Sequence, residues 1–213
     1  DGIHGRVIVS PDRARLDQLL ASAHAVIDEA VRRMVRKKLQ YKLDEPSPVD
    51  ESVIASMEHL ALAQEAANEG AVLLKNNAKA LPLDKTALSR IAVIGALADT
   101  ANIGDNGSSN VRPSFVVTPL QGIRDLLGGQ VVVVHIGKDV LEAADLTRIE
   151  AADAVIVVTG LTFEDEGEGL IGAGDRLDLG LSAERVKLIR DAAAANTHTI
   201  VVLEGGGAVT MAD

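Results

Sequence analysis

The sequence predicts an α/β fold in which a mostly parallel sheet is sandwiched between helices. Four short runs of apolar, largely β-branched residues follow residue 90, and helical patterns lie between them. The chain contains one Tyr, two Phe and no Trp, so its core must consist mainly of Val, Ile, Leu and Ala. Such a core suits parallel strands that are buried on both faces. The alternation of strand and helix favours right-handed crossovers within one sheet.

The first 46 residues are expected to form a helical segment. Apolar residues recur every three or four positions over 12–40, as in a helix with one apolar face. The basic cluster RRMVRKK (Arg32–Lys38) lies on this pattern, and a solvated helix face is favoured over a nucleic-acid patch. Prolines and acidic residues at 43–50 interrupt the pattern, as expected of a linker.

Residues 47–89 are expected to hold a second helix and a short strand. Ser47 is suited to cap this helix, and Pro48 is suited to its first position. The Ala- and Glu-rich pattern that follows ends at Gly70. The apolar segment AVLLKNN (71–77) then predicts a strand.

Residues 90–213 are expected to form the sheet domain. The predicted strands are 91–96, 131–137, 153–160 and 199–207, and the predicted helices are 119–128, 141–151 and 182–195. Ligands of such sheets bind beyond the carboxyl ends of the strands. Two long loops leave those ends, 97–118 after the first strand and 161–181 after the third, and they are the candidates for chemistry.

The composition argues against several classes of protein. Acidic residues outnumber basic ones by 31 to 21, and a net charge of −10 repels nucleic acid. No apolar run approaches the roughly 20 residues of a membrane span, so no membrane partner is expected. The chain has no Cys and no HxH or HExxH spacing, so neither a metal nor another cofactor is expected. A soluble protein is expected, and both cytoplasm and periplasm stay open.

Loop 97–118 contains the small, polar run GDNGSS (104–109), which could cradle a phosphate with backbone N–H groups. It matches neither a P-loop nor a dinucleotide fingerprint, and a tight turn would use the same residues. Asp105, Asn106 and Ser108 carry hydrogen-bonding groups of the kind that bind sugar hydroxyls. They are therefore candidate substrate ligands.

Loop 161–181 crowds four carboxylates into the eight residues FEDEGEGL (163–170). A solvated loop is one interpretation. A calcium site is another, although the spacing does not match an EF-hand. A general acid is the third, because a Glu pressed against other carboxylates has a raised pKa and can hold a proton near neutral pH.

Five segments occur together in a specific order and spacing. They are AANEGAVLLKNNAKALPLD (66–84), IAVIGALAD (91–99), GDNGSSNVRPSFVVTPLQGI (104–123), GLTFEDEGEG with GDRLDLGL (160–181) and ANTHTIVVLEGGGAVTM (195–211). Over residues 25–213 this series resembles glycoside hydrolase family 3, the β-glucosidase family. The resemblance implies three parts: 1–46 from the end of the family's N-terminal (β/α)8 barrel, 47–89 as linker helix and strand, and 90–213 as an α/β-sandwich domain, incomplete at its C-terminus.

The resemblance also implies a retaining hydrolase acting on terminal β-D-glucosyl residues. In the family a barrel Asp attacks the anomeric carbon, and a Glu on a second-domain loop protonates the leaving oxygen, the two carboxyls lying ~5–5.5 Å apart. Glu168, followed by Gly169 and the Asp175–Arg176 pair, best matches this acid/base Glu, and Glu166 is the runner-up. Neighbouring carboxylates would keep Glu168 protonated or line the pocket mouth. The implied partners are a β-glucoside or oligosaccharide and the barrel, which is missing from this chain.

Two alternatives stay open. A non-catalytic α/β module could bind a sugar or small anion without depending on Glu168, and a β-xylosidase-type relative would share the fold. The family's glucosaminidase branch is disfavoured, because it is usually single-domain and uses a His-based acid. Since the nucleophile is missing, the 213-residue chain by itself is expected to be inactive.

Overall fold

The chain divides into two compact units, Asp1–Val72 and Leu73–Asp213. The computed structural model describes residues 13–46, 50–77, 79–104, 107, 111–166, 176 and 178–211. Within those ranges no helix combines the length and the apolar character needed to cross a bilayer.

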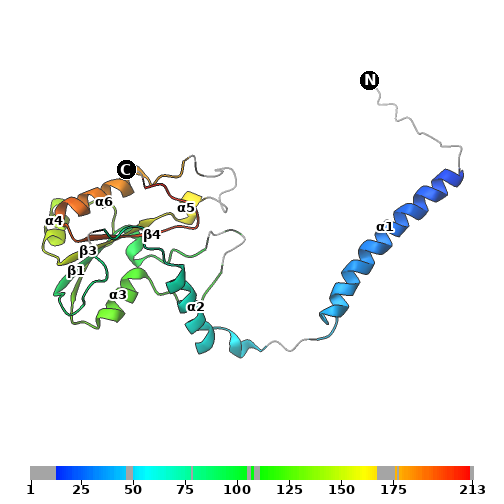
Figure 1. Ribbon diagram of the computed structural model, residues 1–213, viewed down its shortest axis with the longest axis horizontal. Helices are drawn as coiled ribbons and strands as arrows, with labels where there is room; N and C mark the ends of the chain where they lie inside the picture. The colour runs from blue at the N-terminus through cyan, green and yellow to red at the C-terminus, as the bar shows by residue number, and fades with distance from the viewer. Residues whose placement is uncertain are drawn as a thin grey trace, which may run out of the picture. The chain divides into compact units, whose positions relative to one another are not determined.

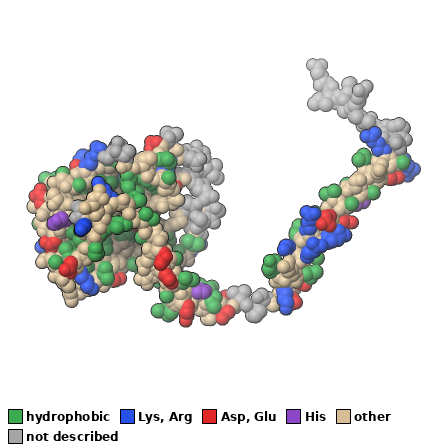
Figure 2. Space-filling view, in the orientation of Figure 1, with side chains coloured by type: hydrophobic (Ala, Val, Ile, Leu, Met, Phe, Trp, Pro, Cys, Tyr) green, Lys and Arg blue, Asp and Glu red, His purple; other side chains and the backbone are tan. Residues whose placement is uncertain are grey.

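The described part of the first unit is helical (Figure 1). Helix α1 spans Arg13–Gln40, the short 3-10 helix η1 spans Glu51–Val53, and α2 spans Met57–Gly70. No residue of these three helices is buried, and apolar side chains such as Leu20 and Ile27 are exposed along α1 (Figure 2). The first predicted helix and the end of the second at Gly70 are confirmed.

Helix α2 begins later than predicted. The expected capping residue, Ser47, lies outside the described residues, and the helix starts at Met57. Ser56 caps it instead, because its hydroxyl accepts a hydrogen bond from the backbone N–H of His59 at 3.3 Å. The local capping signal therefore occurs more than once in this stretch, and the later Ser is the one used.

The predicted strand at 71–77 is wrong. No strand is assigned to this segment, and Leu73 and Leu74 are exposed. An apolar run favours burial, but a strand also needs a neighbouring backbone to pair with. In the part of the chain that the structure describes, the sheet takes all of its pairing from later segments.

The second unit is built on a four-stranded parallel sheet, as predicted. Its strands are β1 (Arg90–Ile94), β2 (Val132–Ile136), β3 (Ala154–Gly160) and β4 (Thr199–Glu204). Their order across the sheet is β2-β1-β3-β4, and all three pairings are parallel. The direction of winding reverses between β1 and β3, which is the place where ligands bind in open α/β sheets.

Helices cover both faces of this sheet (Figure 1). One face is covered by α3 (Pro119–Leu127) and the 3-10 helix η2 (Ala96–Asp99), and the other by α4 (Ala143–Glu150) and α6 (Ala183–Ala195). Alternate strand residues point to opposite faces. Ile91 and Val93 of β1 therefore pack with Leu120 of α3, whereas Ile94 packs with Leu188 of α6. Both cores are aliphatic, as the composition predicted.

Two glycines let the chain leave the sheet at the edge where β1 and β3 end. Gly95 has φ +106°, and a Cβ there would overlap the carbonyl oxygen of Val158. Gly160 has φ +150°, and a Cβ there would overlap the carbonyl oxygen of Glu204. Only glycine fits both the backbone angles and the close approach. The two long loops therefore start from tightly fixed points.

Candidate functional site

A cavity of about 470 Å³ lies at the carboxyl ends of β3 and β4, beside the loop that follows β1. Its lining comes from the two long loops and from the segment that follows β4. The polar side chains that face it include Asn102, Thr162, Glu166 and Glu204. The cavity thus lies at the edge of the sheet where the strand order predicts a ligand.

Asn102 connects the loop after β1 to the ends of two strands. Its Nδ2 donates a hydrogen bond to the carbonyl oxygen of Leu161 at 3.0 Å and another to Oε2 of Glu204 at 3.0 Å. Leu161 follows β3 directly, and Glu204 is the last residue of β4. One amide therefore holds the loop after β1 against the ends of β3 and β4.

Glu166 is fixed against the segment that follows β4. It ends the short helix α5 (Phe163–Glu166), and its Oε2 accepts a hydrogen bond from the backbone N–H of Gly206 at 2.9 Å. A Cβ added at Gly206 or Gly207 would lie 3.0 Å from one of its carboxylate oxygens. The glycines let the backbone approach this close, so the sequence GGG is suited to receive the carboxylate.

Asp165 forms an ion pair with the first turn of α6. Its Oδ2 lies 2.9 Å from Nη1 of Arg185 and accepts hydrogen bonds from Thr162, at 2.8 Å from the backbone N–H and 3.1 Å from Oγ1. Burial alone raises the pKa of Asp165. The Arg185 guanidinium and the Thr162 donors outweigh it, so the pKa lies below its usual value. Asp165 is therefore a paired carboxylate at neutral pH.

These contacts refine the expectation that the carboxylates of FEDEGEGL (163–170) keep Glu168 protonated or line the pocket mouth. The negative charge of Asp165 is balanced by Arg185, so this residue is a weak source of repulsion for its neighbours. Glu164 is exposed, and its backbone N–H donates to Thr162 Oγ1 at 3.2 Å. Of the acidic neighbours, Glu166 is the one that lines the cavity. Among the described residues no cluster of three His, Cys, Asp or Glu is arranged to bind a metal ion.

Four of the predicted site residues lie outside the described residues: Glu168, Asp105, Asn106 and Ser108. Their roles stay predictions. The runner-up, Glu166, is described and lies in the cavity wall.

The sequence analysis missed three residues of the site, Asn102, Glu204 and Arg185. None belongs to a recognisable local motif, since each acts through a partner far along the chain. One sequence pattern could have identified Glu204 as a site residue. It is a polar residue that directly ends an apolar strand pattern at the ligand-binding edge of the sheet.

An α/β domain with a carboxylate-rich loop at the switch point of a parallel sheet belongs to the class that binds or transforms ligands there. Residues 71–213 match the family model described as "Glycosyl hydrolase family 3 C-terminal domain". The chain therefore belongs to glycosyl hydrolase family 3. The family resemblance noted from the sequence is confirmed.

Several relatives share this region. Probable beta-D-xylosidase 7 of Arabidopsis thaliana is 35% identical over 165 residues, which cover 73% of this chain and 20% of the relative. The exo-alpha-(1->6)-L-arabinopyranosidase of Bifidobacterium breve is 32% identical over 167 residues, covering 72% and 22%. Thermostable beta-glucosidase B of Acetivibrio thermocellus is 30% identical over 163 residues, covering 72% and 21%. The chain thus spans about a fifth of the length of these relatives.

Solved structures agree with the fold. The GH3 beta-glucosidase of Bifidobacterium adolescentis superposes with a TM-score of 0.70 at 28% identity, covering 94% of this chain and 30% of that one. The beta-D-glucoside glucohydrolase of Trichoderma reesei superposes with a TM-score of 0.59 at 27% identity, covering 72% and 24%. The relatives are glycoside hydrolases that differ in the sugar named for each.

Proposed function

We propose that this chain supplies the general acid/base to a retaining glycoside hydrolase that removes terminal β-D-glucosyl residues. The observation that carries the proposal is the position of the acidic loop. It leaves β3 at the switch point of the sheet in a domain of glycosyl hydrolase family 3. The nucleophile Asp would lie on a (β/α)8 barrel outside this chain. The division into 1–46, 47–89 and 90–213 is part of the same proposal.

In this mechanism Glu168 has two successive roles. It first protonates the departing glycosidic oxygen while the barrel Asp forms a covalent bond to the anomeric carbon. The resulting carboxylate then takes a proton from water, which attacks the same carbon and releases the sugar. A carboxylate oxygen of Glu166 already accepts a hydrogen bond from the Gly206 N–H, which favours Glu168 over Glu166 as the proton donor.

The test is the substitution Glu168→Gln in the whole enzyme. Loss of general acid catalysis is expected to lower kcat/KM by about 10²–10⁴ for alkyl or disaccharide substrates, whose leaving groups need a proton. For a nitrophenyl glucoside the loss is expected to be much smaller. An equal loss for both substrates would argue against an acid role. The 213-residue chain alone is expected to hydrolyse neither.

A β-xylosidase-type activity is the second candidate, and the names of the relatives favour it, since two β-D-xylosidases of Arabidopsis thaliana are 33% and 35% identical to this chain. The ratio of kcat/KM for nitrophenyl β-glucoside and β-xyloside decides between the two sugars. If neither is cleaved, and a monosaccharide still binds equally to wild type and Glu168→Gln, the non-catalytic module is the better description.

A further inference from the structure

We propose that the cavity at the carboxyl ends of β3 and β4 is a sugar-binding subsite that selects its ligand by charge, and that Glu204 sets this selection. The ligand is a neutral or cationic pyranose, and an anionic sugar such as a uronic acid is rejected. The inference rests on the proposed function only for the choice of a sugar as the ligand. The residues that carry it all belong to the described part of the chain.

The cavity has the size and the lining of a small-molecule site. Its volume of about 470 Å³ lies within the range of roughly 300–1,000 Å³ that such sites occupy. Leu161 and Phe163 supply apolar surface, and Gly205 and Gly206 supply backbone. A pyranose ring has faces of C–H groups and a rim of hydroxyls. A lining that combines apolar surface with a few polar groups therefore suits it.

The charged side chains of the lining are hydrogen-bond acceptors. Glu166 and Glu204 are both half-buried, and a carboxylate has about four acceptor sites. The Gly206 N–H donates to Oε2 of Glu166 at 2.9 Å, and Nδ2 of Asn102 donates to Oε2 of Glu204 at 3.0 Å. These contacts leave acceptor capacity on both carboxylates for the hydroxyls of a ligand. Hydrogen bonds to a charged acceptor are also stronger than those between neutral groups.

The lining offers little to an anion. Both amide hydrogens of Asn102 are used within the protein, one for the carbonyl oxygen of Leu161 and one for Glu204. In the part of the chain that the structure describes, the lining contains no Lys, Arg or His. A negatively charged ligand would therefore meet two carboxylates without a cation to balance it.

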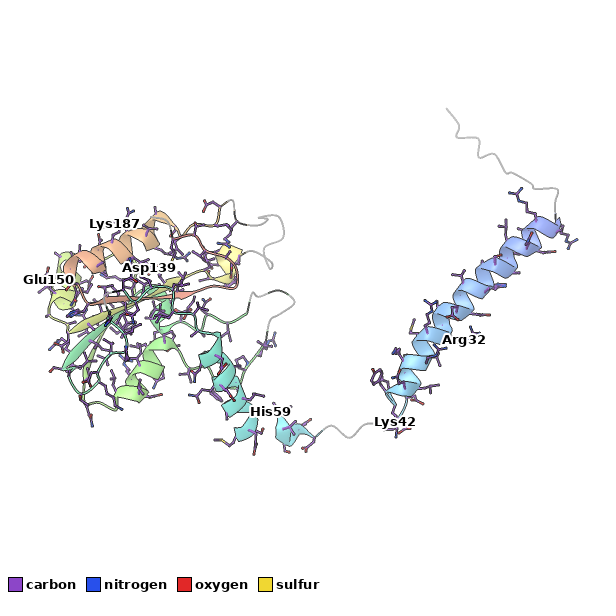
Figure 3. All side chains as sticks on the ribbon, in the orientation of Figure 1. Arg32, Lys42, His59, Asp139, Glu150 and Lys187 are labelled. Carbon is purple, nitrogen blue, oxygen red and sulfur yellow. The ribbon has the colours of Figure 1, made fainter. Side chains whose placement is uncertain are left out.

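Two basic side chains at the start of α6 are engaged elsewhere. Arg185 is paired with Asp165 at 2.9 Å. Lys187 is paired with Asp191 and lies on the outer side of the helix (Figure 3). Neither cation is directed to the cavity, so the negative charge of its two carboxylates is not cancelled from this helix.

The described contacts offset the charge of Glu166 more than that of Glu204. A Cβ added at Gly207 would lie 3.0 Å from Oε1 of Glu166 and 3.1 Å from Nη2 of Arg176, so the two charged groups approach the same glycine. Opposite charges this close offset each other in part. The partner described for Glu204 is the neutral amide of Asn102, which leaves its charge in place. Glu204 is therefore the carboxylate that sets the selection.

Three sugars that share one ring test this electrostatic selection. At pH 6 glucosamine carries a positive charge, glucose carries none and glucuronate carries a negative charge. Like charges brought together at a binding site reduce affinity, and opposite charges increase it. The expected order of affinity is therefore glucosamine, then glucose, then glucuronate.

The experiment titrates the isotope-labelled 213-residue chain with each sugar and follows the amide signals of Gly205 and Gly206 by NMR. Wild type is expected to bind glucosamine a few-fold more tightly than glucose, and glucuronate at least about tenfold more weakly. Glu204→Gln removes the charge but keeps an oxygen that can accept from Asn102. This variant is expected to bring the three affinities within about twofold of one another.

Two further variants serve as comparisons. Glu164→Gln removes an exposed carboxylate of α5 that lies outside the lining, and it is expected to leave the order and the spacing of the affinities unchanged. Glu166→Gln is expected to narrow the differences less than Glu204→Gln does. In 1 M salt, where the Debye length is about 3 Å, the differences are expected to shrink in wild type as well. This last measurement needs no substitution, so the charge selection stays testable if Glu204→Gln does not fold.

Three results would overturn the inference. They are equal affinity of wild type for glucose and glucuronate, a charge preference that a folded Glu204→Gln variant keeps, and no change of the glycine signals with glucose. The proposed function fails by a different result, which is that the whole enzyme cleaves no glycoside. Because binding to the 213-residue chain needs no catalysis, each of the two can fail while the other stands.

Discussion

The side-chain amide of Asn102 donates a hydrogen bond to the carboxylate of Glu204, 102 positions later in the chain, at 3.0 Å. The same nitrogen donates to the carbonyl oxygen of Leu161. A donor is required on this side chain, because both partners are acceptors. The two loops and the end of β4 are thereby joined at a single polar atom.

Asn102→Asp is expected to destabilise the chain more than Asn102→Ala does at pH 7. Alanine removes two hydrogen bonds, at a cost of about 1–2 kcal/mol. Aspartate removes them and also places a second carboxylate beside Glu204. Urea unfolding at pH 7 measures the difference. Equal stability of the two variants at pH 7 would show that the Glu204 carboxylate is not close to residue 102.

Glu166→Gln is expected to change activity of the whole enzyme only a few-fold, even with poor leaving groups. The glutamine carbonyl oxygen can still accept the Gly206 N–H, so the anchoring contact is retained. The measurement is kcat/KM for a disaccharide, beside Glu168→Gln. A loss at position 166 as large as the loss at 168 would move the acid/base assignment to Glu166.

Gly95→Ala is expected to destabilise the chain by about 3 kcal/mol or more. The new Cβ would overlap the carbonyl oxygen of Val158, and the positive φ adds strain. Gly128→Ala is the matched control. Its φ of +59° carries the strain of about 1–2 kcal/mol, but nothing lies within 4 Å of the added atom. Thermal unfolding of both variants separates steric overlap from backbone strain.

Asp145 is expected to make folding stability fall in acid. This buried carboxylate accepts hydrogen bonds from Lys138 Nζ at 2.8 Å and from the backbone N–H of Glu142 at 3.0 Å. These contacts hold its pKa below the ordinary 3.8. Because the folded pKa is the lower one, the contribution is complete above pH 3.8 and is lost as pH falls through the folded value.

The corresponding measurement compares thermal unfolding of wild type and Asp145→Asn from pH 7 to pH 2.5. Asp145→Asn is expected to cost about 1–2 kcal/mol at pH 7, through loss of the charged contact with Lys138, whereas the amide oxygen can still accept the Glu142 N–H. The two curves are expected to converge at the acid end. Asp125→Asn, at an exposed position of α3, is the control and should follow wild type throughout. A constant gap at every pH contradicts the prediction.

The sheet could be predicted because its signals are local. Each strand is a continuous apolar run, and residues such as Ile91 and Val93 occupy one face by alternation alone. The start of α2 could not be fixed, because several Ser residues offer a cap. The apolar segment 71–77 was wrongly predicted to be a strand, because a sequence does not reveal whether a strand has a partner to pair with.

The sequence predicts the location of the site but not the contacts within it. The strand pattern indicates the edge of the sheet from which the two long loops leave. The acidic run FEDEGEGL (163–170) marks loop 161–181 as the candidate for chemistry. The contacts that shape the cavity join residues far apart in the chain, as in Asn102 with Glu204 or Asp165 with Arg185. Such pairs depend on the strand order, and no local pattern encodes them.

The strand order also has a consequence during synthesis. Strand β1 ends at Ile94 and lies between two strands that are both made later, the first of which begins about 40 residues further on. At ~5–20 residues per second, a ribosome leaves this apolar segment without a neighbour for roughly 2–8 s. Segment β1 is therefore unpaired over that interval, when a chaperone that shields short hydrophobic stretches would protect it from aggregation.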